Sequence, residues 1–151
     1  MRGFDAFLDR SASKGDMEAS SVVVLPVKEE KVLLQLRDEH APTDPEEWAF
    51  FGGGMEKDES PIEAVRREAF EEIRLRVEDP LLFCKRKQPH PYFLTEYVFI
   101  VPVDEKDVEG LELHEGCDMG WFGVKDLPGL DMAEHKKYVF RLAMNYVENE
   151  L

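Results

Sequence analysis

Cysteine and positive charge are both scarce in this chain of 151 residues. The two cysteines, Cys84 and Cys117, lie far apart without a Cys-x-x-Cys spacing, which argues against a zinc site or a disulfide framework and indicates reduced thiols. The 19 lysines and arginines face 33 aspartates and glutamates, giving a formal net charge of −14. Because so acidic a chain repels phosphate backbones and anionic lipids, we expect neither a nucleic-acid polymer nor a membrane as its partner.

Long hydrophobic runs are also missing. No apolar stretch is long enough to cross a bilayer, and no signal-peptide pattern is found at the start, so the expected location is the cytoplasm. Repeats and low-complexity segments are absent, and the length suits one domain with one core. Residues 1–19 show no sustained periodicity and are predicted to be an N-terminal arm or appended element, followed by a single domain at residues 20–151.

The sequence does contain a strong signal for the start of a helix. The segment Ser60-Pro61-Ile62-Glu63 combines an N-cap hydroxyl, a proline at the first helical position and a glutamate three residues after the cap. The helix is therefore predicted to start at Ser60. Apolar residues recur at helical spacing and predict its packed stripe: Ile62, Val65, Ala69 and Ile73.

Carboxylates crowd a neighbouring face of this helix. Glu68, Glu71 and Glu72 lie at spacings that make them neighbours, and like charges so placed destabilise an isolated helix by roughly 0.2–0.5 kcal/mol per pair. A divalent cation would turn that repulsion into ligation, since a hard cation such as Mg²⁺ prefers oxygen ligands. The preceding run Gly52-Gly53-Gly54, predicted to be a turn, lets backbone come close to a ligand or metal.

In this stretch the chain resembles the Nudix hydrolase family, whose box reads G-x5-E-x7-R-E-U-x-E-E-x-G-U with U apolar. The matching residues are Gly53, Glu59, Arg67, Glu68, Ala69, Glu71, Glu72 and Leu75. Arg74 stands where the family has glycine, a change that affects the helix exit rather than the carboxylates. The resemblance covers roughly residues 21–146 and implies the Nudix fold, an α/β/α sandwich of the α+β kind with a mixed β-sheet between helices.

The resemblance also implies a role for individual residues. Mg²⁺, or alternatively Mn²⁺, would be held by Gly52 through its carbonyl and by Glu68, Glu71, Glu72 and Glu115. Arg67 and Glu59 would position the carboxylates, and either Glu68 or Glu115 would be the general base. Glu115 precedes Gly116 in a loop before an aromatic strand, where several family members carry an acid that reaches the metal; the alternative is an ordinary exposed glutamate.

Substrate contacts are predicted around the box, at Gly53, Arg37, Trp48, Lys85 and Lys87. Trp48 either stacks on a base or packs in the core. The triplet that contains Lys85 and Lys87 either ends a strand in solvent or contacts phosphate.

The remaining elements are predicted from local patterns. Residues 20–27 and 31–38 form a hairpin, residues 77–87 and 92–103 are strands, and 120–122 is a short strand. Residues 104–110 are expected to be an acidic loop, and His90 between two prolines a loop residue without catalytic duty. A second capping box at Asp131–Glu134 is predicted to open a final helix that ends near Asn149.

The activity implied by the resemblance is that of a pyrophosphatase. It is the Mg²⁺-dependent hydrolysis of a nucleoside diphosphate linked to another moiety, cleaved within the pyrophosphate by metal-activated water. Nucleoside triphosphates, favoured slightly by the small size, compete with nucleotide sugars and ADP-ribose. A non-catalytic Nudix-fold nucleotide-binding module is the other hypothesis, but such a module has no need of mutually repelling Glu68, Glu71 and Glu72. The expected assembly is a monomer or homodimer.

Overall fold

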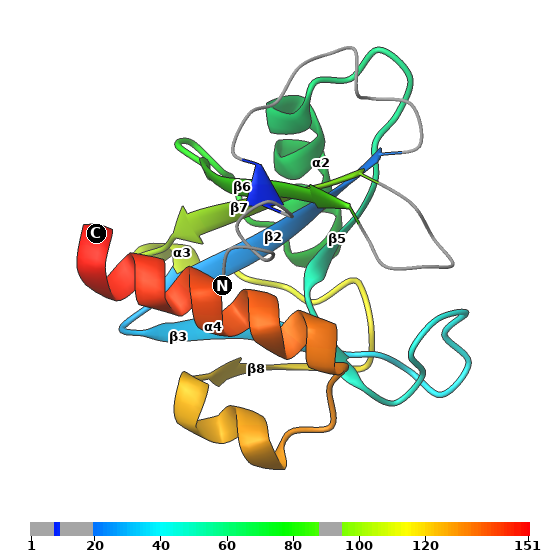
Figure 1. Cartoon of the computed structure of the whole chain (residues 1–151). Coiled ribbons are helices and arrows are strands. Elements are labelled where there is room, and N and C mark those ends of the chain that lie inside the picture. Colours follow the sequence, from blue (N-terminus) through cyan, green and yellow to red (C-terminus); the bar gives the residue numbers. More distant parts are fainter. Residues whose placement is uncertain (1–7, 10–19, 88–94) are drawn as a thin grey trace.

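The computed structural model describes residues 8–9, 20–87 and 95–151 (Figure 1). The prediction for His90 lies outside the described residues. The strands are β1 (Leu8–Asp9), β2 (Ser20–Lys28), β3 (Lys31–Leu36), β4 (Trp48–Ala49), β5 (Phe51–Gly54), β6 (Leu81–Lys87), β7 (Thr95–Pro102) and β8 (Asp118–Phe122). The helices are α2 (Pro61–Ile73), α3 (Glu105–Glu109), the 3-10 helix η2 (Val124–Gly129) and α4 (Glu134–Glu150).

The strands form one mixed sheet in the order β1-β6-β7-β2-β3-β4. β2 and β7 run parallel, whereas the other pairs are antiparallel. One edge of β2 is shared, because Ser21–Val24 pair with β5 and Val27–Lys28 pair with β3. β8 adds to the far side of β3. The predicted mixed sheet is therefore confirmed.

The sheet lies between two helical layers. Successive residues of a strand point to opposite faces. On β2, Val22 and Val24 accordingly pack in the core under α2, whereas Val23 and Leu25 pack in the core under α4. Figure 1 shows α2 and α4 on opposite sides of the sheet. The predicted α/β/α sandwich is confirmed, and each functional residue can be placed by the face on which it lies.

The glycine run is a strand and not the predicted turn. Gly52–Gly54 belong to β5 and pair with β2. Gly52 has φ +141°, and a Cβ there would lie 2.1 Å from the Val22 carbonyl oxygen, so only glycine allows this close pairing. The chain reverses later, where the Glu59 N–H donates to the Glu56 carbonyl.

The capping box of α2 is present as predicted. The Ser60 hydroxyl accepts from the Glu63 N–H, and the Glu63 carboxylate accepts from the Ser60 N–H at 2.8 Å. The predicted packed stripe is wrong at Ile62, which is 44% exposed. Its place is taken by Ala64, while Glu72 joins Val65 and Ala69 on the buried side.

Other element boundaries also differ from the sequence prediction. The strand predicted from residue 77 begins at Leu81, because Arg66 donates to the carbonyls of Val77 and Glu78 and holds them out of the sheet. The acidic segment 104–110 contains α3, with Asp104 as its N-cap.

The second capping box is not formed. α4 begins at Glu134, whereas a cap at Asp131 predicts a start at Met132; its N-cap is Ala133, which makes no side-chain hydrogen bond. Asp131 lies outside the helix, and its carbonyl accepts from the Trp48 N–H at 2.9 Å. This backbone hydrogen bond holds Asp131 beside β4, so the residue does not cap α4. None of the helices within the described ranges is long and apolar enough to span a bilayer.

Arg74 ends α2 in the left-handed conformation, at φ 59° and ψ 26°. Because a Cβ is unfavourable there, Arg74→Gly should stabilise the protein by up to about 1 kcal/mol with little effect on catalysis. The arginine also donates to the Phe70 carbonyl and lies over the Phe70 ring. Arg74→Ala is therefore the matched control, since it loses the same contacts but keeps the Cβ. Equal melting temperatures for the two variants would show that this strain is negligible, and loss of activity in both would give the arginine a functional role.

Candidate active site

Arg67 is the centre of an ion-pair network on α2. Its Nε and Nη2 donate to the two oxygens of Glu59 at 2.7 and 2.9 Å. Its Nη1 donates to Glu68 at 2.8 Å and to Glu71 at 3.3 Å, and Nη2 also reaches the Gly54 carbonyl at 3.0 Å. The hydrogen bond from Arg67 is the main reason that the pKa of Glu59 lies below its ordinary value. The arginine thus ties two helix carboxylates to Glu59 and to β5.

Glu72 is the buried carboxyl of the site. The residue is 4% exposed, and its Oε1 accepts from the Gly52 N–H at 2.8 Å. Burial raises the pKa of Glu72 to about 9, and the charges of Glu68 and Glu115 act in the same direction. Glu72 therefore lies on the packed side of α2, not on the separate face predicted for it. Glu72 comes seven residues, about two helical turns, after Val65 and therefore lies on the same buried face of α2. It differs from the other residues of that face in being acidic rather than apolar.

The segment 111–116 docks on the end of α2. The Glu112 N–H donates to the Ile73 carbonyl at 3.1 Å, and the His114 N–H donates to the Glu72 carbonyl at 2.6 Å. Both carbonyls belong to the last turn of the helix, where carbonyls lack partners within the helix. The loop is therefore held to α2 by backbone hydrogen bonds, and Leu111 and Leu113 add packing against the core under this helix.

Gly116 turns this loop so that Glu115 comes near the helix carboxylates. Its φ is +74°, and a Cβ there would lie 2.6 Å from the Leu36 carbonyl oxygen and 2.8 Å from Gln35 Oε1. Any side chain at this position would push the loop away from β3. Glu115 is exposed, yet close enough to contribute to the raised pKa of Glu72. The structure thus brings the predicted loop acid and helix acids together.

The strand β5 lies directly against these carboxylates. A Cβ on Gly53 would lie 2.7 Å from Glu68 Oε1, so any side chain at this position would displace the Glu68 carboxylate. Gly52 contacts Glu72 through its N–H. The predicted residues on β5, α2 and the 111–116 loop therefore converge on one place.

The donor set fits a hard divalent cation. No group of three His, Cys, Asp or Glu side chains in the described part of the chain is already arranged to hold a metal ion. Glu68 and Glu71 are instead drawn toward Arg67. However, a buried carboxyl beside two further carboxylates ionises readily only with positive charge nearby, and its oxygen donors are those that Mg²⁺ prefers. The residues present therefore suit the metal in chemistry, and Glu68 and Glu71 would have to turn from Arg67 to reach it.

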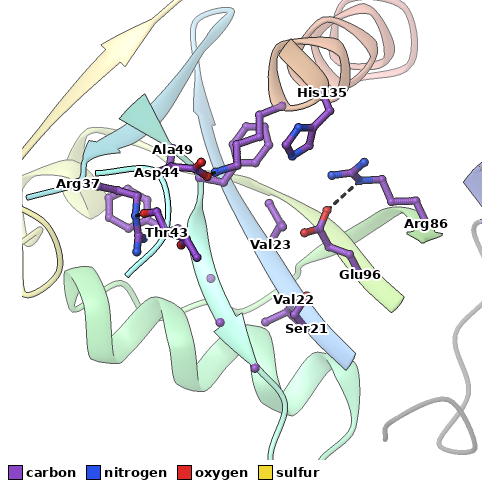
Figure 2. A pocket seen from close by; sticks show the side chains of 16 residues that line it. Ser21, Val22, Val23, Arg37, Thr43, Asp44, Ala49, Arg86, Glu96 and His135 are labelled. Atoms are coloured by element: carbon purple, nitrogen blue, oxygen red, sulfur yellow. Dashed lines mark hydrogen bonds and ion pairs between the residues drawn. The ribbon is translucent and has the colours of Figure 1, made fainter. Parts of the chain in front are cut away.

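A cavity of about 370 Å³ lies on the opposite face of β5, toward α4 (Figure 2). Gly52, Gly53 and Gly54 line it, while Glu68 and Glu72 approach the same strand from the α2 side. One strand of backbone without side chains thus separates the cavity from the carboxylates. Among the predicted substrate contacts, Arg37 and Gly53 line this cavity.

The other predicted substrate contacts lie elsewhere. Trp48 packs edge-on against Phe122 with ring centroids 4.7 Å apart, which matches the core-packing alternative. Lys85 and Lys87 do not line the cavity, whereas Arg86 between them does. Because neighbouring residues of a strand face opposite ways, a triplet on β6 cannot present all its charges to one site.

The sequence analysis missed the charged residues on the inner wall of the cavity. Arg86 Nε donates to Glu96 Oε1 at 2.8 Å, and both residues are nearly buried. His135 lies close by; burial lowers its pKa, and the positive charges of Arg86 and Lys136 add to that effect. The sequence signal that could have identified this pair is Glu96, a single glutamate inside the apolar strand β7. Its partner Arg86 lies directly opposite on β6.

Comparison with known proteins identifies relatives of this chain. The model of the NUDIX domain matches residues 17–143. The NAD-capped RNA hydrolase NudC of Chromobacterium violaceum is 31% identical over 113 residues, which make up 75% of this chain and 41% of that protein. The chain therefore spans about two fifths of the length of this curated relative.

Solved structures share the fold. A MutT protein from Methanosarcina mazei Go1 has a TM-score of 0.68 at 22% identity, covering 87% of this chain and 96% of that one. A mutT/nudix family protein from Listeria innocua has a TM-score of 0.69 at 21% identity, covering 87% and 93%. At such identities the likeness concerns the fold alone.

Proposed function

The chain belongs to the Nudix family of pyrophosphohydrolases. From this premise we propose that it uses Mg²⁺ to cleave a nucleoside diphosphate linked to another group. Nucleoside triphosphates are the first substrate candidates. The observation that carries the proposal is the buried Glu72 carboxyl, flanked by Glu68 and Glu115 behind a strand of glycines. Burial favours the protonated form of Glu72 in the apo-protein, whereas a bound cation would stabilise the ionised carboxylates of the cluster.

The proposed ligands are the Gly52 carbonyl and the carboxylates of Glu68, Glu71, Glu72 and Glu115. When bound, Mg²⁺ would neutralise charge on the diphosphate oxygens and lower the pKa of a coordinated water. Arg67 has a positioning role, since it holds Glu68 and Glu71, and Glu59 fixes Arg67 in turn with a two-point contact.

Glu115 is the better candidate for the general base. A general base must take a proton within hydrogen-bond reach of the attacking water. Glu68 already accepts a 2.8 Å hydrogen bond from Arg67, which engages one of its oxygens. Glu115 is exposed on a loop that backbone hydrogen bonds and the packing of Leu111 and Leu113 hold against α2, which leaves its carboxylate able to meet a water.

The cavity supports a nucleotide substrate. Its volume lies within the range of small-molecule sites. Arg37 brings positive charge to its wall, and Lys136 forms an ion pair there with Asp44 at 2.8 Å. In a chain with a net charge of −14, a cavity wall with these cations favours an anionic ligand. We assign Arg37 to the phosphates and the cavity to the nucleoside.

The relative's name favours a second substrate candidate, a dinucleotide end such as NAD or NAD-capped RNA. NAD-capped RNA as a substrate would differ from the expectation, drawn from the acidic composition, that no nucleic-acid polymer is a partner. Like ADP-ribose and nucleotide sugars, it presents a diphosphate to the same carboxylates. The non-catalytic binding module is the alternative from another class.

Product analysis tests the proposal. Purified protein with Mg²⁺ would be offered nucleoside triphosphates, NAD, ADP-ribose and nucleotide sugars, with products separated by ion-exchange chromatography. We expect a nucleoside monophosphate and pyrophosphate from a triphosphate. Orthophosphate with a nucleoside diphosphate would show that a different bond is cleaved, and no turnover of any compound with Mg²⁺ or Mn²⁺ would favour the binding module.

Mg²⁺ should also raise the melting temperature of the wild type, because the cation binds the folded carboxylate cluster and not the unfolded chain. At a concentration about 100-fold above Kd, the stabilisation is about 2.7 kcal/mol, or roughly 5–10 °C for a domain of this size. Differential scanning fluorimetry with and without MgCl₂ measures it, and NaCl of equal ionic strength is the control. A melting temperature that responds equally to both salts would contradict a specific site.

A further inference from the structure

A row of polar residues crosses the sheet along the inner wall of the cavity. Arg86 on β6 stands opposite Glu96 on β7, and Glu96 stands opposite Ser21 on β2. Ser21 is in turn opposite Gly54 on β5. All four line the cavity, on the face of the sheet that α4 covers (Figure 2). The row thus leads from the glycine strand to a buried arginine.

The ion pair of Arg86 with Glu96 is a poor device for stability alone. The two residues are 5% and 6% exposed, and the bond between Nε and Oε1 is 2.8 Å long. The desolvation of two buried charges offsets most of their attraction, and apolar residues of similar volume often stabilise a protein as well or better. The next residue on the same face of β7 is the apolar Val98. A role toward a ligand in the cavity gives a reason for the pair.

The position of this pair favours the uncharged part of a nucleotide. Arg86 lies three strand spacings, about 14 Å, from Gly54, whereas the diphosphate of the proposed reaction lies beside the glycines and the carboxylates. Arg86 and Glu96 also cancel each other's charge, unlike Arg37, so their wall does not attract phosphate strongly. Val23 and Phe50 line the same cavity and offer apolar surface to the faces of a ring.

We propose that Arg86 is a specificity-determining residue that reads the substrate's base and selects guanine. Its Nε is engaged by Glu96, which fixes the planar guanidinium, and Figure 2 shows the group reaching from β6 toward His135. An arginine fork donates two hydrogen bonds to the adjacent acceptors O6 and N7 of guanine, whereas adenine presents a donor at the matching position. This inference rests on the proposed nucleotide substrate.

Binding of nucleoside monophosphates without metal tests the inference apart from turnover. Isothermal titration calorimetry with GMP, AMP, CMP and UMP should give wild-type protein an affinity for GMP about 10- to 100-fold above that for AMP. Arg86→Lys keeps the buried charge pair but lacks the fork, and should reduce this preference to less than about threefold. The double variant Arg86→Gln with Glu96→Gln removes both buried charges. It should also reduce the preference for GMP to less than about threefold while its affinity for AMP is retained.

Arg141→Gln is the matched control, because Arg141 is exposed on α4 and does not line the cavity. It should keep the wild-type preference. Equal affinity of the wild type for all four nucleotides, a preference for another base, or a GMP preference that survives Arg86→Lys would each overturn the inference. A wild type that hydrolyses nucleotides without a base preference refutes only this inference, whereas selective GMP binding without any turnover refutes only the proposed activity.

Discussion

Glu72→Gln should lower kcat by about 10³-fold or more while the protein stays folded. The carboxylate is the buried member of the proposed cation site, and the stabilisation that a catalytic metal gives a phosphoryl transition state amounts to several kcal/mol. Glutamine has the same shape, and its carbonyl oxygen can still accept from the Gly52 N–H that now bonds Glu72. Steady-state kinetics with Mg²⁺ measures the loss.

The stability of the same variant distinguishes function from structure. Because burial raises the pKa of Glu72 to about 9, the carboxyl must take up a proton on folding at neutral pH. Glutamine avoids this cost, so the melting temperature without metal should be unchanged or higher. Glu71→Gln should likewise abolish turnover without unfolding, although its side chain is 56% exposed. Glu63→Gln on the same helix is the matched control, since glutamine also serves in a capping box and Glu63 has no place in the site. Active but unstable Glu72→Gln protein would identify the residue as structural.

Glu115→Gln should lower kcat by a factor of about 10² to 10⁴, the range for loss of a general base, with a smaller change in KM. The loop is held by hydrogen bonds of the Glu112 and His114 backbone, and these remain in the variant. The effect should therefore come from the carboxylate alone. Steady-state kinetics on the substrate found by product analysis measures both parameters.

Glu112→Gln is the control for this experiment, because it makes the same change at an exposed position of the same loop. It should keep wild-type kinetics. Should Glu115→Gln keep near-full activity while Glu68→Gln does not, the base lies on α2 and the assignment of the loop is wrong.

The parts of the fold that the sequence predicted are those specified by local chemistry. The Ser60 and Glu63 pair defined the start of α2, and the β-branched run in residues 20–27 predicted the strand β2, which is buried on both faces. The resemblance also marked Arg74 as the residue at the helix exit where the family has glycine, and the residue is left-handed there. Each of these signals depends on residues close together in the chain.

Features that depend on pairing between distant segments were not predicted. Gly52–Gly54 read as a turn because glycine is common in turns, and only the close approach of β2 makes them a strand. For Trp48, base stacking and core packing were both considered, and its contact with Phe122 could not be predicted because it depends on the neighbouring position of β8. Arg86 was passed over for the lysines beside it, since its partner Glu96 is defined by the register of β6 and β7.

Whether acids from α2 and from the 111–116 loop form one cation site is tested most directly by Mn²⁺ binding, followed by electron paramagnetic resonance without substrate. We expect the wild type to bind Mn²⁺, Glu72→Gln to bind at least about 10-fold more weakly, Glu115→Gln to be weakened to a lesser degree, and Glu63→Gln to match the wild type. Equal Mn²⁺ affinity in all four proteins would contradict a shared site built from Glu72 and Glu115.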